Sequence, residues 1–291
     1  MNILLTGKNG QVGWELQRTL LPIGMVTACD HAGLDIADAA AVRRRLDELR
    51  PDVIVNAAAY TAVDKAESEP EQANAVNAAA PALLAQEAAR RGALLIHYST
   101  DYVFDGAKSV PYVESDKTNP LGAYGRSKLA GEEGIRAAGC DHLIFRTSWV
   151  YAARGANFLR TILRLAAERE ELRVVNDQIG APTWARLIAE ATALALRQAL
   201  AERRHGRFES GLFHLACAGE TSWHGFASAI VAGRSGLRVS TVTPITTADY
   251  PTPATRPANS RLNTDAFRTR FGLALPDWRD CLQICLEEIP Q

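Results

Sequence analysis

The sequence has few of the features that mark membrane, secreted or nucleic-acid-binding proteins. No stretch approaches the ~18 uninterrupted apolar residues of a membrane-spanning helix, and the first residues, MNILLTG, lack the basic and apolar segments of a signal peptide. The 32 basic and 33 acidic side chains nearly cancel without forming a block of one sign, so neither nucleic acid nor a membrane surface is an expected partner. The five cysteines lack Cys-x-x-Cys spacing, which disfavours a disulfide framework or a zinc site. We therefore expect a cytoplasmic protein that acts on a small molecule.

The first half of the chain alternates short apolar runs with longer amphipathic stretches, which is typical of βα units around a parallel sheet. Continuous rather than alternating apolar runs indicate strands that are buried on both faces. We predict strands at residues 3–5, 25–29, 53–55, 94–97 and 143–145. We predict helices from the spacing of Val12, Leu16 and Leu20, from that of Val42, Leu46 and Leu49, and across the alanine-rich residues 71–91.

The regular alternation of apolar runs and amphipathic stretches becomes less clear after residue 151. Further helices are predicted at residues 156–167 and 184–200, and strands near 174–175 and 213–215. A proline-rich loop at residues 250–257 is either a plain connector or a rigid wall of a site. The predicted fold class is therefore α/β, with a Rossmann-type doubly wound parallel sheet in residues 1–150, to which later segments return. Residues 151–291 are predicted to form mainly a smaller mixed α/β substrate-binding domain.

A glycine-rich loop at residues 6–13 follows the first predicted strand and opens the first helix. Glycines in this position allow a tight turn and bring backbone N–H groups and the helix N-terminus against a pyrophosphate. The spacing is Gly-x-x-Gly-x-x-Gly rather than Gly-x-Gly-x-x-Gly, and an ordinary strand-to-helix turn is the alternative. The predicted cofactor-binding residues of this loop are Gly7, Gly10, Gln11, Val12 and Gly13.

Two later segments extend the predicted cofactor site. Asp30 ends the second strand about twenty residues beyond the loop, where an acid can accept from ribose hydroxyls, although a helix cap or a solvated acid is the alternative. Such an acid favours NAD over NADP, but basic neighbours can offset it, so NADPH or NADH remains open. The segment at residues 56–61, which ends the third strand, contains small residues that either let a cofactor lie close or simply pack tightly. Its predicted cofactor-binding residues are Ala59, Tyr60 and Thr61.

Tyr124 and Lys128 form the chain's one Tyr-x-x-x-Lys pair, at the start of a predicted helix where they share one face. An ammonium beside a phenol lowers the pKa of the phenol from about 10, which makes the tyrosine a candidate acid for carbonyl reduction. An ordinary surface pair is the alternative. Thr100, at the carboxyl end of the fourth strand, adds a hydroxyl where ligands of open α/β sheets bind.

The glycine loop, the Ser/Thr position and Tyr-x-x-x-Lys, in this order, resemble the extended short-chain dehydrogenase/reductase family. Distinctive strings extend the resemblance over most of the chain, among them residues 146–151 (RTSWVY) and 256–262 (RPANSRL). They are similar to the branch of the family that completes dTDP-L-rhamnose synthesis by reducing dTDP-4-dehydro-β-L-rhamnose.

The resemblance implies roles for individual residues. Hydride from NADPH or NADH would reach C4 of the sugar while Tyr124 protonates the oxygen, with Lys128 and Thr100 assisting. By the same matching, the cofactor site would include Asp35, Ile36 and Tyr98, and the sugar site would include Thr100, Asp101, Trp149, Arg256 and Asn259.

The resemblance also carries a departure. Members of the family can form dimers around magnesium held by glutamates at positions matching Glu15, Arg186 and Glu288. A guanidinium cannot ligate magnesium, so we predict no metal site and either a monomer or a weak homodimer.

The sequence offers two alternative functions. A nucleotide-sugar epimerase or dehydratase of the same superfamily is one, although Asp101-Tyr102 after Thr100 is not the Asp-Glu pair of such dehydratases. A non-catalytic cofactor-binding regulatory subunit is another, but the presence of both Tyr124 and Lys128 argues against it.

Overall fold

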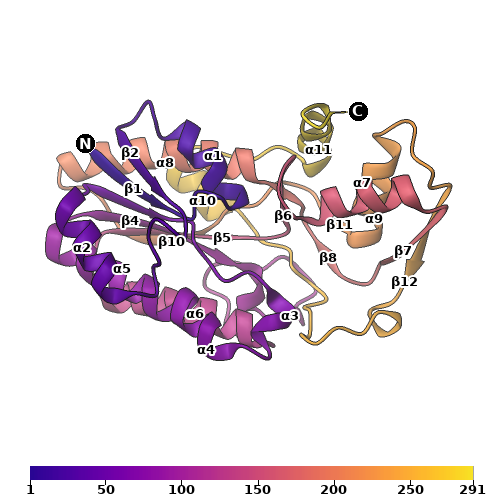
Figure 1. Cartoon of the computed structure of the whole chain (residues 1–291), viewed down its shortest axis with the longest axis horizontal. Coiled ribbons are helices and arrows are strands. Elements are labelled where there is room, and N and C mark those ends of the chain that lie inside the picture. The colour runs from indigo at the N-terminus through magenta and orange to yellow at the C-terminus, as the bar shows by residue number, and fades with distance from the viewer. Residues whose placement is uncertain (291) are drawn as a thin grey trace.

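The computed structural model describes residues 1–290, and its centre is a six-stranded parallel sheet in the order β10-β5-β4-β3-β1-β2 (Figure 1). The interior strands are almost fully buried because helices cover both faces of the sheet. This arrangement confirms the predicted doubly wound α/β fold. The strands are β1 (Asn2–Thr6), β2 (Met25–Cys29), β3 (Val53–Asn56), β4 (Leu94–Thr100), β5 (His142–Thr147) and β10 (Gly211–His214).

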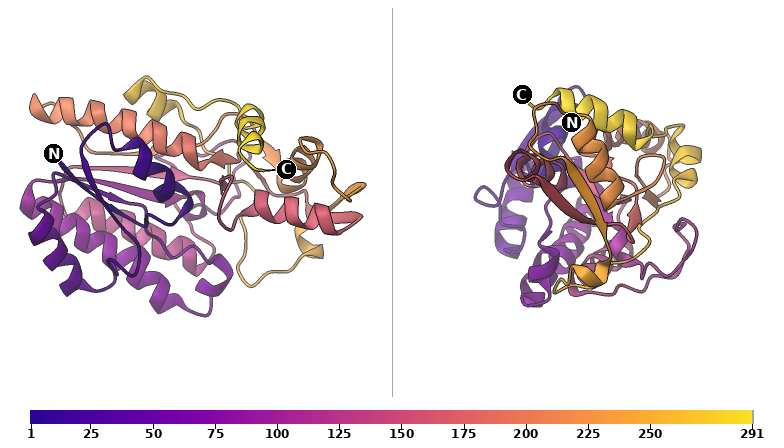
Figure 2. Two further views of the ribbon diagram at one scale, coloured as in Figure 1. Left: turned by 45° about the horizontal axis from the view of Figure 1, so that its top comes forward. Right: turned by 90° about the vertical axis from the view of Figure 1, so that its right-hand side faces the viewer.

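The two faces of the sheet carry different helices, which Figure 2 shows on opposite sides of the strands. Successive strand residues point to opposite faces, so Ile3 and Leu4 enter separate cores. The Ile3 face packs against α1 (Gln11–Thr19), α8 (Ala185–Arg204) and α10 (Asp265–Phe271). The Leu4 face packs against α2 (Ala39–Leu49), α5 (Ala80–Arg91) and α6 (Ala123–Ala137).

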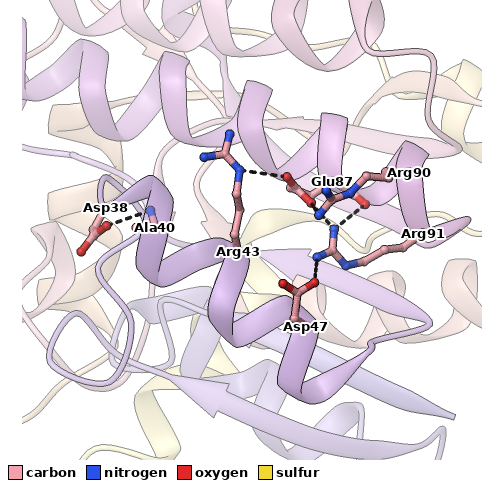
Figure 3. A network of polar contacts seen from close by, with 7 residues as sticks. All are labelled: Asp38, Ala40, Arg43, Asp47, Glu87, Arg90 and Arg91. Atoms are coloured by element: carbon pink, nitrogen blue, oxygen red, sulfur yellow. Dashed lines mark hydrogen bonds and ion pairs between the residues drawn. The ribbon is translucent and has the colours of Figure 1, made fainter.

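Ion pairs join α2 to α5 along the outer surface (Figure 3). Glu87 of α5 is 5% exposed and accepts from Arg43 of α2 at 3.2 Å and from Arg90 at 2.5 Å. Arg91 bridges Glu87 to Asp47 of α2. A carboxylate that is largely removed from water needs such partners, and their loss would leave it uncompensated.

The predicted helix at residues 71–91 is interrupted by a π-helical turn. Helix α4 (Pro70–Asn74) leads into this turn (Ala75–Ala79), and α5 follows without a break. Inside the turn, Asn77 accepts from the Tyr60 N–H at 2.9 Å and donates to the Tyr60 carbonyl at 3.0 Å. Alanine-rich composition predicts a helix but does not indicate such a bulge, inside which Asn77 pairs with a residue 17 positions away.

A second hydrophobic cluster lies beyond the carboxyl edge of the sheet. It is formed by α7 (Phe158–Glu168), α9 (Trp223–Ala232) and α11 (Trp278–Glu287), with β7 (Glu171–Val175) paired to β12 (Thr241–Ile245). The remaining elements are short: α3 (Val63–Ala66), β6 (Val150–Tyr151), β8 (Ile179–Gly180), β9 (Thr183–Trp184) and β11 (Thr221–Ser222). Helices α7 and α8 match the predictions at residues 156–167 and 184–200, whereas the domain boundary at residue 150 stays a prediction. None of the helices within residues 1–290 is long and apolar enough to cross a membrane.

The glycine loop fixes the start of α1 against β1, and its three glycines differ in how closely they are packed. A Cβ on Gly13 would lie 2.0 Å from the Gly7 carbonyl oxygen, whereas a Cβ on Gly10 would lie 3.3 Å from the same atom. We expect Gly13→Ala to lower the free energy of unfolding by about 1–3 kcal/mol, because a backbone atom must move. Gly10→Ala is the matched control and should cost clearly less. Urea denaturation checks both variants, and equal losses would contradict this account of the loop.

Candidate active site

The loop before α1 has the geometry of an anion-binding turn. Gly7 adopts φ +75°, and the Gly10 N–H donates to its carbonyl at 3.0 Å. Gly10 then caps α1 without any side-chain hydrogen bond, so the first N–H groups of the helix face the loop. Glycine at this cap leaves room for a phosphate at the positive end of the helix.

Asp30 lies beside this loop, at the end of β2. Its carboxylate accepts from the Gly33 N–H at 2.9 Å and the Asn9 amide at 3.2 Å, and it pairs with Lys8 at 3.3 Å. The Gly33 N–H and the Lys8 ammonium hold the pKa of Asp30 below its usual value. The acid expected to bind a ribose is therefore ionised and has a cation next to it.

Tyr124 lies in the first turn of α6, where Glu67 accepts from the Ala123 N–H at 2.7 Å and so fixes the helix start. Its ring meets Tyr102 edge to face at 5.6 Å. Burial raises the pKa of Tyr124 above its ordinary value, and a contact with the Thr100 hydroxyl only partly offsets this. The expected lowering of this pKa is therefore wrong for the structure, and the phenol is firmly protonated at neutral pH.

The amino group of Lys128 has its own partners on β4. Nζ donates to the Tyr98 carbonyl at 2.6 Å and lies 3.3 Å from His97 Nε2. The side chain is 2% exposed, and burial lowers the pKa of Lys128 to about 8, against the opposing effect of Glu132. The pair expected from the sequence is present on α6, but in this geometry the lysine faces β4.

Thr100 and Asp101 stand at the end of β4 beside the phenol. The Thr100 hydroxyl donates to Asp101 Oδ1 at 3.0 Å and accepts from the Tyr102 N–H at 3.2 Å. Burial raises the pKa of Asp101 to about 6, although the Ser260 and Thr100 hydroxyls favour the carboxylate. This places a carboxyl group that can change its protonation state next to the expected proton donor.

Trp149 is held in an unusual conformation two residues beyond β5. It has φ +48°, a region that costs a non-glycine residue about 1–3 kcal/mol, and such strain clusters at functional sites. One ring face stacks on Trp223, with centroids 3.6 Å apart and planes inclined by 7°. A Cβ on Gly180 would lie 2.5 Å from Cε2 and 2.8–2.9 Å from Nε1 and Cζ2, which places it over the other face. The indole is therefore held between Trp223 and Gly180.

Arg256 and Asn259 are engaged within the chain. Arg256 binds Asp64 through both terminal nitrogens, at 3.0 and 2.9 Å. Asn259 is 6% exposed, donates to the carbonyls of Lys108 and Val110, and accepts from Arg261. Both side chains hold the loop that follows residue 250, and their role in substrate binding stays a prediction.

The remaining predicted cofactor residues are spread along the same sheet edge. Tyr60 donates to Glu69 at 2.5 Å, and the Tyr98 hydroxyl lies 2.8 Å from Thr192 Oγ1 of α8. Ile36 is buried in the core, whereas the Asp35 side chain accepts from the Ala37 N–H at 2.9 Å. Gln11 donates to the Val150 carbonyl at 3.3 Å, and Val12 packs against the core. Ala59 and Thr61 lie on either side of Tyr60, after β3.

Arg186 lies between Glu15 and Glu288, the two glutamates at the positions that match the family's magnesium site. Its guanidinium contacts Glu15 of α1 at 3.3 Å and also binds Glu288, which follows α11. Burial raises the pKa of Glu288, an effect that Arg186 opposes. The cation therefore joins three helices within one chain.

Sequence reasoning did not select His97, Asn56 or Trp223. His97 had a signal, since it is a polar residue in an apolar strand that should be buried on both faces. Asn56 ends the buried strand β3 and carries a similar signal. Trp223 had none, because it meets Trp149 only through the fold.

Comparison with known proteins adds independent findings. The family described as RmlD substrate binding domain matches residues 1–290. A dTDP-4-dehydrorhamnose reductase from Burkholderia thailandensis is 54% identical, with 99% of each chain covered. A crystal structure of a dTDP-4-dehydrorhamnose reductase from Clostridium acetobutylicum superposes with a TM-score of 0.90 at 38% identity, with 99% of each chain covered. The corresponding enzyme from Bacillus anthracis, in complex with NADP, gives a TM-score of 0.89 at 34% identity, again with 99% coverage of both.

The buried Asp101 makes stability depend on pH in an unusual direction. Its folded pKa of about 6 exceeds the ordinary value, so the folded state holds the proton more tightly than the unfolded state. This contribution is fully present below about pH 4 and is lost as pH rises to about 6, by roughly 3 kcal/mol. We expect Asp101→Asn to remove this loss and to raise the midpoint of thermal unfolding at pH 7.5.

Asp105 supplies the control, because the Ala107 N–H and Asn119 lower its pKa. Asp105→Asn should therefore reduce stability at pH 7.5. Calorimetry between pH 4 and 8 distinguishes the variants, and a destabilised Asp101→Asn protein would contradict the burial argument.

The Arg186 bridge predicts metal-independent behaviour. Wild-type thermal stability and sedimentation should be unchanged by Mg²⁺ or EDTA, because the guanidinium occupies the space between the carboxylates. Arg186→Glu should lose on the order of 2–3 kcal/mol through like-charge repulsion, and Mg²⁺ should restore part of it. A wild-type dimer that dissociates in EDTA would overturn this hypothesis.

Proposed function

We propose that this chain, which belongs to the RmlD substrate binding domain family, reduces dTDP-4-dehydro-β-L-rhamnose to dTDP-β-L-rhamnose with NADPH or NADH. The observation that carries the proposal is the partly buried, protonated Tyr124 phenol, which contacts the Thr100 hydroxyl at the carboxyl edge of the sheet. Ligands of open α/β sheets bind at this edge. A proton donor in this position suits the reduction of a carbonyl group.

The residues present fit a dinucleotide. The uncapped N-terminus of α1 and the close backbone packing around Gly7 and Gly13 leave a concave turn that a Cβ would fill. We infer that this loop would hold the pyrophosphate, with Asp30 and Lys8 near the adenosine ribose. When bound, the nicotinamide cofactor supplies the hydride.

The chain's own residues then handle the proton. Tyr124 donates its phenolic proton to the developing alkoxide at C4. Thr100 can turn its hydroxyl from Asp101 Oδ1 to the carbonyl oxygen, and a protonated Asp101 would make this easier because it accepts less strongly. Lys128, one helical turn farther along α6, would stabilise the phenolate that remains if its ammonium turned from the Tyr98 carbonyl toward Tyr124, as an opposite charge favours the ionised form of an acid.

The sugar would lie against the edge of Trp149. The sandwich between Trp223 and Gly180 fixes this edge, so it can limit the space beside the sugar ring without itself moving. Arg256 and Asn259 would shape the opposite loop, consistent with their contacts to Asp64 and to backbone carbonyls. We further propose that the protein is cytoplasmic and acts as a monomer or weak homodimer; its five free, buried cysteines suit a reducing compartment.

The test is to mix the protein with the dTDP-4-keto sugar and either NADPH or NADH, and to follow the loss of the reduced nicotinamide absorbance. This assay measures activity and cofactor preference together. We expect Tyr124→Phe to lower kcat by roughly 10²–10⁴-fold, the usual contribution of a general acid. Tyr102→Phe removes a neighbouring phenol of the same size, and we expect a much smaller effect. Unchanged turnover in Tyr124→Phe would refute the assignment of the acid, and the absence of turnover in the wild type would refute the function.

A further inference from the structure

A chain of buried polar side chains lies behind Lys128, across the ends of three strands. The Thr6 hydroxyl donates to Asn56 Oδ1 at 2.7 Å, Asn56 Nδ2 lies 3.1 Å from His97 Nδ1, and His97 Nε2 lies 3.3 Å from Lys128 Nζ. Thr6, Asn56 and His97 are neighbours in strand register, so the sheet itself places them side by side. All four residues are at most 2% exposed.

The direction of this chain of hydrogen bonds is set by a backbone group. Asn56 Oδ1 also accepts from the Ala58 N–H at 3.3 Å, and a backbone N–H can only donate. Turning the amide around would place its NH₂ group against this N–H. Asn56 therefore presents its Nδ2–H to His97 Nδ1, which must offer a lone pair.

The consequence for Lys128 follows from the two nitrogens of a neutral imidazole. When Nδ1 accepts, Nε2 carries the proton, and this N–H points at Lys128 Nζ. An ammonium has only donors and cannot accept from it. A neutral amine can accept from His97 and still donate to the Tyr98 carbonyl at 2.6 Å.

Some of the other groups around Lys128 favour its ammonium form, and others favour its neutral amine. On α6, Glu132 favours the ammonium, but it is held in a two-pronged ion pair by Arg146 of β5, at 2.8 and 2.6 Å. On β4, the Tyr98 carbonyl accepts from either form. Burial disfavours the ammonium, and it also keeps His97 uncharged by lowering the pKa of the imidazole well below its ordinary value.

We propose that His97, oriented by Asn56 and Thr6, is a positioning residue that stabilises the neutral amine of Lys128. The amine and the ammonium are then close in free energy, so Lys128 can lose and regain a proton near neutral pH. In catalysis, which rests on the proposed function, only the ammonium form of Lys128 can favour a Tyr124 phenolate, so His97 would set the pH range in which that form is present.

The tautomer of His97 provides a direct test that needs neither substrate nor cofactor. ¹⁵N spectra of the full chain with labelled histidine distinguish a protonated from an unprotonated ring nitrogen, and the loss of the signal in His97→Gln assigns it. At pH 9 we expect a neutral ring with the proton on Nε2. A proton on Nδ1 throughout the range from pH 6 to 10 would overturn the proposal.

The substitution Asn56→Asp should reverse the direction of the hydrogen bonds from residue 56 to Lys128, with a side chain of nearly the same shape. A carboxylate only accepts, so His97 should move its proton to Nδ1 and offer Nε2 to the ammonium. The chain has only five lysines, so ¹³C labelling at the lysine ε-carbon can follow Lys128. We expect its titration to move upward by at least one pH unit.

The added negative charge alone would also favour the ammonium, so the same substitution in a His97→Leu background is the control. There the charge remains but the imidazole link is removed, and we expect most of the upward shift to disappear. An equal shift in both backgrounds would show a simple charge effect and overturn the relay through His97. If either variant fails to fold, the wild-type tautomer decides the question. Because these measurements involve no turnover, their failure is distinguishable from a failure of the proposed reductase activity.

Discussion

The parallel direction of all six central strands determines where the chemistry of this protein can lie. Parallel strands end at the same edge, so Thr6, Asn56 and Thr100 meet there although they are far apart in the sequence. Side chains alternate along β4, which sends His97 toward Lys128 on α6 and Tyr98 toward Thr192 on α8. One strand therefore supplies contacts to helices on both faces of the sheet.

Burial at this edge changes the ionisable groups in a consistent way. Removal from water disfavours every charged form, so it raises the pKa of Tyr124 and of Asp101 and lowers that of Lys128. The two acids hold their protons more tightly, and the lysine holds its proton less tightly. This combination suits proton donation from the phenol, but it costs stability, because an uncharged or apolar side chain at position 101 would be easier to bury.

Local spacing predicted the parts of the site that local geometry builds. The glycine loop, the buried strands and the Tyr124–Lys128 pair all depend on residues within one or two helical turns or one strand. The predicted α/β fold was confirmed, whereas the roles of the loop and of the pair stay predictions. The sign of the Tyr124 pKa shift was wrong, because burial depends on Tyr102 and other groups that sequence spacing does not bring together. The π-helical turn was missed for the same reason.

Contacts between segments that are distant in the sequence could not be predicted from local spacing, even where the residue itself was singled out. Arg186 was recognised as a cation in an unusual place, but only the fold shows that it bridges Glu15 and Glu288, residues 171 and 102 positions away. The stack of Trp149 on Trp223 had no sequence signal at all. A single residue type at one position can be interpreted chemically, but its partners follow from topology.

Helix α8 connects these distant contacts to the proton chemistry. It begins directly after β9, and β9 pairs with β6, the strand that follows Trp149. Farther along, Thr192 of α8 meets Tyr98, whose carbonyl accepts from Lys128. Arg186, near the start of α8, ties it to α1 behind the glycine loop and to the end of α11. Helix α8 is therefore linked to the Trp149 segment through β9 and to Lys128 through Tyr98, so we expect changes along α8 to alter the site without touching Trp149 or Tyr124.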